Sequence, residues 1–293
     1  EVFKTTPKEK IPFVVVTLTC NASGGQPVSV ENLKTVHKLA EKYGVKILFD
    51  SARFAENAYF IKSREKEYHG HSIKDIVAEM FQYADMMTMS SKKDAIVNIG
   101  GFMAFREKEI YNQASTYNIM FEGFVTYGGM SGRDMNALAR GLYESIEFDY
   151  LETRIGQVAY LGERLENFGI PVQRPFGGHA IFVDANKFLS ELPREHLRAQ
   201  TLAVELYLEA GVRSAEIGTL LADRDPVTRE NRFPELELLR LAIPRRVYTN
   251  NHMDVVAVAL KNVFDRKDEI RKGLKIIYEA PIMRHFTVEL ERM

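Results

Sequence analysis

The sequence predicts an α/β protein built around a mainly parallel sheet, and the order of its apolar segments is the reason. A β-branched run at 13–19 is followed by a helical apolar pattern at 30–40, a strand at 45–49, a helix that begins after Ser72, and a strand at 86–89. Strands that alternate with helices are typical of right-handed crossovers between parallel strands. The continuous apolar character of the run at 13–19 favours a central strand covered on both faces.

Local signals define the ends of the first two helices. Ser29 can cap the first helix, whose apolar positions fall on one face until Gly44 ends it. Ser72 and Asp75 form a start that resembles a capping box for the second helix. The segment between Asp50 and Ser72 is polar.

The second half of the chain follows a different pattern. From about 134 to 168 the sequence is helical, and we expect one long connector between two domains. Short strands and helices alternate beyond it, with strands around 180–183, 212–217 and 238–243 and helices around 197–210 and 253–264. We therefore expect residues 1–149 to belong to a large domain and residues 150–293 to form a smaller α+β domain.

Composition and charge indicate a small-molecule partner. The 39 Lys and Arg residues nearly balance the 40 Asp and Glu residues, so no net field would attract nucleic acid or an anionic membrane. The continuous apolar run at 13–20 has about eight residues, far fewer than the ~20 needed to span a bilayer. Cys20 is the only cysteine, which excludes an internal disulfide and favours a cytoplasmic location.

Polar residues follow each of the three expected parallel strands. Asn21 follows the first, Asp50 the second, and Ser90 and Lys93 the third. Ligands of open parallel sheets bind at the carboxyl ends of the strands, so these residues are expected to gather at one edge. Singly, an Asp at a strand end is more often a turn former, and Lys92 with Lys93 is more often a solvated pair. Together they favour a site in which a partly desolvated lysine supplies the neutral amine of Schiff-base chemistry.

Four segments carry a resemblance to a known family. They are Asn-x-x-Gly-Gly-Gln-Pro-Val-Ser at 21–29, Asp-Ser-Ala-Arg-Phe-Ala-Glu-Asn at 50–57, Met-Ser-Ser-Lys-Lys-Asp at 89–94 and Leu-Arg-Leu-Ala-Ile-Pro-Arg at 239–245. In this order and spacing the chain resembles the β-eliminating lyases, which include tryptophanase and tyrosine phenol-lyase. The resemblance implies the PLP-dependent transferase (aspartate aminotransferase-like) fold, with pyridoxal 5'-phosphate (PLP) bound by the large domain.

The resemblance also implies roles for the residues at the strand ends. Lys93 would bind PLP as a Schiff base and then take the α-proton of the substrate. Asp50 would pair with the pyridinium nitrogen and keep it protonated. Asn21 and Arg53 would bond the phenolic oxygen of the cofactor, and Ser90 would contact its phosphate.

Further roles concern the amino-acid substrate, the cation and the assembly. Arg240 would clamp the α-carboxylate of the substrate, for which a guanidinium fork is suited. The family uses a monovalent cation, typically K⁺, and the backbone carbonyl of Asn98 lies at a matching position. The resemblance further implies a homotetramer with active sites at a dimer interface.

Three residues bear on the leaving group. Ile217 stands where tyrosine phenol-lyases have an arginine, and it cannot hydrogen-bond a phenol hydroxyl. His285 and Phe124 also resemble tryptophanase, so we expect β-elimination of L-tryptophan to indole, pyruvate and ammonia, with His285 orienting the indole or a proton donor. A satisfied core histidine is the alternative for His285.

Two other interpretations of the chain stay open. The segments 97–102, 132–135 and 244–249 look more like tyrosine phenol-lyase, which favours phenol release. Relatives also carry a substantial portion before the segment that corresponds to Glu1. The chain is therefore expected to be the C-terminal part of such an enzyme, and it could be a catalytically incomplete fragment.

Overall fold

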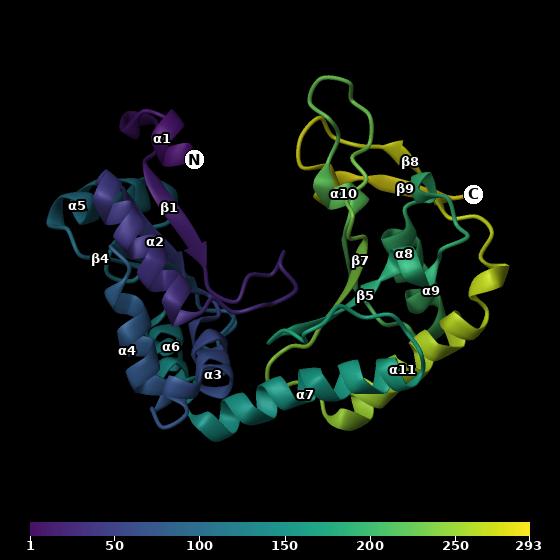
Figure 1. Ribbon diagram of the computed structural model, residues 1–293, viewed down its shortest axis with the longest axis horizontal. Coiled ribbons are helices and arrows are strands. Elements are labelled where there is room, and N and C mark those ends of the chain that lie inside the picture. Colours follow the sequence, from purple (N-terminus) through teal and green to yellow (C-terminus); the bar gives the residue numbers. More distant parts are fainter. The chain divides into compact units, whose positions relative to one another are not determined.

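The computed structural model describes residues 1–293, which form two compact units (Figure 1). Unit 1 comprises Glu1–Asn21 and Gln26–Arg154, and unit 2 comprises Ala22–Gly25 and Ile155–Met293. The division falls after Arg154, inside the long helix α7 (Phe148–Asn167). No helix of the chain is both long enough and apolar enough to cross a membrane.

Unit 1 contains a four-stranded sheet in the order β1-β2-β3-β4. Its strands are β1 (Phe13–Thr17), β2 (Lys46–Asp50), β3 (Met86–Ser90) and β4 (Gly101–Phe105). The first three strands are parallel, as the sequence predicted, and β4 runs antiparallel to β3. Asp50 pairs with Thr17 on one side and with Thr88 on the other, so the three parallel strands end at the same edge.

Helices cover this sheet and close its core. The longer ones are α2 (Val30–Tyr43), α3 (Phe54–Arg64), α4 (Ile73–Gln82), α5 (Lys108–Phe121) and α6 (Gly132–Glu144), with short turns at Val2–Thr5, Lys8–Lys10 and Lys66–Tyr68. The predicted caps are confirmed, because the hydroxyls of Ser29 and Ser72 accept hydrogen bonds from the first turns of α2 and α4. Gly44 ends α2 at φ 63°, a left-handed conformation that favours glycine.

The position of β1 in the sheet differs from the expectation. It is an edge strand among residues 1–293, and Phe13 and Val15 are 41% and 53% exposed. The expectation of a central strand covered on both faces was wrong for this reason. A β-branched run reports that a segment favours an extended backbone, but it does not report how many neighbours pair with it.

Two of the longer helices, α3 and α5, were not predicted, and one expected helix is divided into two. Helix α3 lies in the polar segment between Asp50 and Ser72. It was not predicted because the fully buried Glu56 and Asn57 interrupt the apolar periodicity that indicates a helix. Helix α5 was also missed. The expected connector at 134–168 is divided into α6 and α7 (Phe148–Asn167), and the hydroxyl of Ser145 between them donates to the carbonyl of Leu142.

Unit 2 contains an antiparallel sheet in the order β5-β7-β6. Its elements are α7, β5 (Ala180–Asp184), α8 (Ala185–Phe188), a turn at Arg194–His196, α9 (Arg198–Ala210), β6 (Ala215–Ile217), α10 (Thr219–Ala222), β7 (Leu238–Ala242), α11 (Asn250–Asp265), a turn at Lys267–Glu269, β8 (Leu274–Tyr278), α12 (Arg284–Thr287) and β9 (Glu289–Arg292). One face of the sheet packs on α7, α9 and α11 through a large apolar core. The hairpin of β8 and β9 was not expected.

A buried ion pair joins α3 to the start of α7. Arg154 Nε donates to Glu56 Oε1 at 3.3 Å, and the two side chains are 3% and 0% exposed. We expect Arg154→Met to lower the free energy of unfolding by about 3–5 kcal/mol, because it leaves a buried carboxylate without its cation. The measurement is urea denaturation.

The double variant Glu56→Leu with Arg154→Met serves as the control for this prediction. Removing both charges leaves no unpaired ion, so its loss of stability should be smaller than the sum of the two single losses. Additive losses would contradict the prediction.

Candidate functional site

The carboxyl ends of β2 and β3 bring an acid, a hydroxyl and an amine to one edge of the unit 1 sheet. Asp50 is the last residue of β2, and Ser90 is the last residue of β3, the adjacent parallel strand. Lys93 follows shortly after, and its Nζ donates to Ser90 Oγ at 3.0 Å. Backbone bonds continue past the strand ends, since Ser51 N donates to the Thr88 carbonyl at 2.9 Å.

Asn21 and Arg53 lie in the loops that follow β1 and β2. The loop after β1 turns back on itself, because Cys20 N donates to the carbonyl of Gln26 at 3.2 Å. Arg53 is the residue before α3 and is 8% exposed. Arg53 and the first turn of α3 therefore follow directly the strand that ends in Asp50.

The two adjacent lysines differ in their environment. Lys93 is half-buried and bonded to Ser90, whereas Lys92 is exposed. Their neighbours Ser91 and Asp94 are 0% and 1% exposed. Partial desolvation is the property that favours a neutral amine, and only Lys93 of the pair combines it with a contact at the strand ends.

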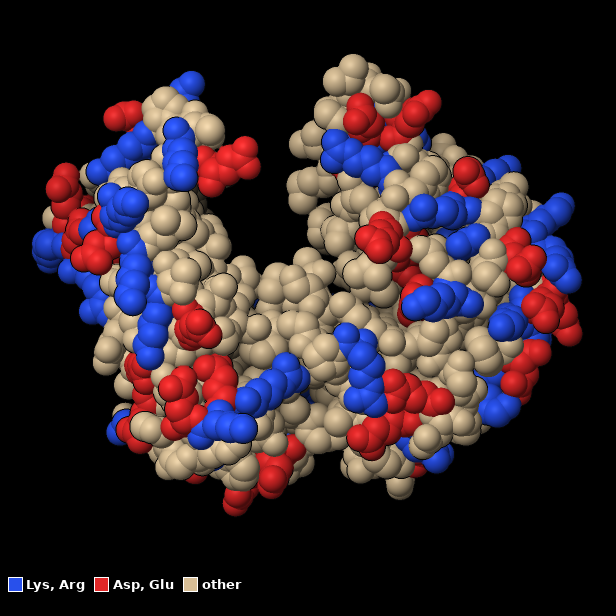
Figure 2. All heavy atoms as spheres, in the orientation of Figure 1, with Lys and Arg blue, Asp and Glu red and all other residues tan.

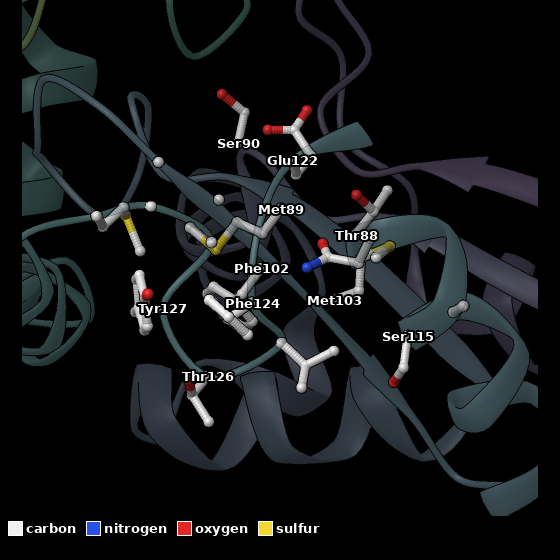
Figure 3. A pocket seen from close by; sticks show the side chains of 18 of the residues that line it. Thr88, Met89, Ser90, Phe102, Met103, Ser115, Glu122, Phe124, Thr126 and Tyr127 are labelled. Atoms are coloured by element: carbon white, nitrogen blue, oxygen red, sulfur yellow. The ribbon is translucent and has the colours of Figure 1, made fainter. Parts of the chain in front are cut away.

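A pocket of about 630 Å³ lies beside this cluster, between the β3–β4 pair and the segment that follows α5. Figure 3 shows Thr88, Met89 and Ser90 from β3 together with Phe124, Thr126 and Tyr127 from that segment. Phe124 is 62% exposed, and its ring centroid lies 5.7 Å from that of Tyr127. Ser90 lines this pocket and also contacts Lys93, so it joins the pocket to the cluster at the strand ends.

Asn98 lies in the connection between β3 and β4 and is exposed. The chain holds no group of three or more His, Cys, Asp or Glu side chains arranged to bind a metal ion.

Arg240 and Ile217 share one face of the sheet in unit 2. Arg240 of β7 pairs with Phe182 of β5 and Ala215 of β6, while Ile217 pairs with Leu238. Leu238 and Arg240 are two residues apart on one strand, so their side chains leave the same face. Ile217 packs there against a small apolar cluster of Ala180, Phe182 and Leu238.

His285 contacts a carboxylate that the sequence analysis did not single out. Its Nδ1 lies 3.2 Å from Glu216 Oε2, with the two side chains 21% and 1% exposed. Glu216 also accepts hydrogen bonds from the backbone of Leu220 and Leu221 at the start of α10. Glu216 and Ile217 are consecutive strand residues, so their side chains leave opposite faces of β6.

Further buried polar residues surround Glu216. Arg284 is 1% exposed and donates to the carbonyls of Thr219 and Leu220, and Glu237 accepts from the backbone and the hydroxyl of Thr219 at 2.9 and 2.7 Å. Burial raises the pKa of Glu237, and the nearby carboxylate of Glu216 adds to the rise. A glutamate between apolar residues of a short strand is the sequence signal that could have revealed this cluster.

The raised pKa of Glu237 gives a prediction about stability. The folded protein holds this proton more tightly than the unfolded chain, so the stabilisation is complete below the ordinary glutamate pKa of about 4.3 and is lost as the pH rises through the folded value. We expect the free energy of unfolding of Glu237→Gln to increase relative to that of the natural chain as the pH rises through the folded pKa of Glu237. Urea denaturation at a series of pH values measures the difference, and a difference independent of pH would contradict it.

Comparison with solved structures identifies the fold class. The structure of SPT with PLP as an internal aldimine aligns with 91% of this chain and 58% of that chain, at a TM-score of 0.55 and 14% sequence identity. The chain therefore has the aspartate aminotransferase-like fold of PLP-dependent transferases, as the sequence predicted. Identity this low shows the fold alone.

Comparison of sequences identifies the family. The Beta-eliminating lyase family matches residues 2–259, so this chain belongs to the β-eliminating lyases, and the predicted family is confirmed. A probable beta-eliminating lyase of Trichomonas vaginalis is 67% identical over 98% of this chain and 62% of that protein. Tyrosine phenol-lyases of Nostoc punctiforme and Symbiobacterium thermophilum are 49% and 50% identical over 97% of this chain. The chain spans about three fifths of the length of these curated relatives.

Proposed function

We propose that this chain carries cofactor-binding and substrate-binding residues of a PLP-dependent lyase that eliminates the aromatic group of an amino acid. The observation that carries the proposal is the hydrogen bond from Lys93 Nζ to Ser90 Oγ at the carboxyl end of β3, next to the strand that ends in Asp50. Membership of the β-eliminating lyase family supports the reaction class.

The residues at this edge fit the chemistry of PLP. The cofactor presents an aldehyde, a pyridine nitrogen, a phenolic oxygen and a phosphate. An amine, a carboxylate, a guanidinium and a hydroxyl are available from Lys93, Asp50, Arg53 and Ser90. When bound, PLP supplies an electron sink for the charge left at the substrate α-carbon.

The side chains of unit 1 would hold the cofactor and move one proton. Lys93 would hold the cofactor through its amine and would accept the α-proton of the substrate. Asp50 holds a proton on the pyridine nitrogen, because a negative partner favours the charged ring. Asn21 and Arg53 hydrogen-bond the phenolic oxygen, and Ser90 donates to the phosphate.

Tryptophanase and tyrosine phenol-lyase differ in the aromatic side chain of the substrate that they cleave. Ile217 packs in the apolar cluster with Phe182 and Leu238, and such a wall accepts an indole ring but offers no partner to a phenol hydroxyl. Arg240 on the same face binds the α-carboxylate as a bidentate fork. We propose L-tryptophan as the substrate on this basis. The roles of Phe124 and His285 toward the leaving group stay predictions from the family resemblance.

Tyrosine phenol-lyase activity is the second candidate. It is favoured by the relatives of that name at 49–50% identity. The segments 97–102, 132–135 and 244–249 favour it as well. A K⁺ ion at the carbonyl of Asn98, a homotetramer and a cytoplasmic location remain predictions from the family resemblance.

The first experiment tests PLP attachment. The purified chain is incubated with PLP and reduced with borohydride, and the modified lysine is located by mass spectrometry. We expect the label on Lys93, with Lys93→Ala losing it and the exposed neighbour Lys92→Ala keeping it, because only Lys93 is held at the strand ends. Labelling spread evenly over surface lysines would reject the proposed site and favour an incomplete fragment.

The second experiment decides between the two leaving groups. Ile217→Arg is expected to lower kcat/KM for indole release from L-tryptophan by about 10- to 200-fold, since it places a charge in an apolar wall. Ile217→Leu keeps the wall apolar and is the matched control. Phenol release from L-tyrosine by the natural chain, without indole release from L-tryptophan, would establish the second candidate instead.

A further inference from the structure

Asp94 directly follows Lys93, but its side chain is buried and bonded to a distant helix. It is 1% exposed, and its Oδ2 accepts hydrogen bonds from Ala55 N at 2.8 Å and Glu56 N at 3.1 Å. Both donors belong to the first turn of α3. The carboxylate therefore caps a helix that begins 40 positions earlier in the chain.

The cap is needed because α3 lacks a local one. Arg53 stands at the position before the helix and makes no capping hydrogen bond with its side chain. The first backbone N–H groups of a helix need an acceptor, and the positive end of the helix dipole favours a carboxylate. Asp94 supplies that acceptor.

A third hydrogen bond joins the same two segments through the backbone. Asp94 N donates to the carbonyl of Ala52 at 3.2 Å. Ala52 lies between Asp50 and Arg53, so the lysine-bearing loop is tied directly to the loop that carries both of these residues. Three hydrogen bonds from one residue restrict sliding as well as rotation of one loop against the other.

The other side of the lysine-bearing loop is confined by α6. A methyl group on Gly141 would lie 1.7 Å from the carbonyl oxygen of Ala95, which shows how closely the helix approaches the loop. Ile96 N donates to the Lys93 carbonyl at 3.0 Å, and Ile96 takes φ 56° in the tight turn. The loop is thus held between α3 and α6.

We propose that Asp94 is a positioning residue, which fixes Lys93 relative to the Asp50–Arg53 segment by binding the first turn of α3. It touches neither substrate nor cofactor in this role. The inference rests on the proposed function, because it concerns the placement of the amine that binds PLP. Without the two hydrogen bonds of the Asp94 carboxylate only the backbone bond to Ala52 ties the loops together. The lysine-bearing loop can then shift, and the exposed Lys92 competes with Lys93 for the aldehyde.

The test compares PLP attachment in variants of the full chain. After incubation with PLP and borohydride reduction, mass spectrometry gives the ratio of label on Lys93 to label on Lys92. We expect Asp94→Ala to lower this ratio about tenfold or more, because a small misplacement of a reacting group has a large effect on its reaction. Asp94→Asn keeps an oxygen acceptor without the charge. Its labelling ratio should therefore lie between those of the natural chain and Asp94→Ala.

Asp85 provides a matched control at the opposite end of the strands. Its Oδ2 accepts a hydrogen bond from Ile47 N at 2.8 Å, so it is also a carboxylate bound to the backbone of unit 1. Asp85→Ala should weaken the fold but leave the labelling ratio unchanged. Hydrogen exchange at Ala55 and Glu56 should accelerate in Asp94→Ala and not in Asp85→Ala.

The outcomes separate this inference from the proposed function. If the natural chain is labelled on Lys93 and both Asp94→Ala and Asp94→Asn show the same labelling ratio as the natural chain, the positioning role is wrong. The proposed function then stands. If Asp94→Ala does not fold, the ratio in Asp94→Asn decides in the same way. Absence of label on Lys93 in the natural chain overturns both proposals.

Discussion

The parallel pairing of β2 with β3 is the constraint on which the candidate site depends. It sets Asp50 beside Thr88, two residues before the end of the next strand, and so delivers Ser90 and Lys93 to the same edge. Parallel strands end together only when helices return the chain across the sheet, and α3 and α4 make that return between these two strands. The core of unit 1 therefore serves the site by holding this register.

Charges on the surface contribute little to this arrangement. Figure 2 shows basic and acidic side chains interspersed on the visible face, in keeping with the net charge of -1. The charged groups that matter are buried and bonded to specific partners, as with Asp94 and Glu56. A net charge close to zero is compatible with the small-molecule partner that the sequence predicts.

The sequence predicted the elements whose apolar residues recur at a regular period. Helix α2 and strands β2 and β3 are examples, because their buried residues alternate or recur as a two-layer core requires. Helix α3 was not predictable in this way, since polar Glu56 and Asn57 occupy its buried face and are satisfied by distant partners. Likewise, Asp50, Ser90 and Lys93 could be proposed from their places after strands. The contacts of Asp94 and Glu216 could not, because backbone donors and folded loops complete them.

The register of β6 against β7 separates two tasks of recognition. The side chains of Arg240 and Ile217 lie on the same face of the sheet, on neighbouring strands. Arg240 pairs with Ala215, and Ile217 pairs with Leu238. In the proposed function, Arg240 binds the α-carboxylate, which every amino acid shares, and Ile217 contacts the side chain, which differs from one amino acid to another. On that proposal, a substitution at position 217 alone would change which aromatic ring is preferred and would leave the binding of the carboxylate unchanged.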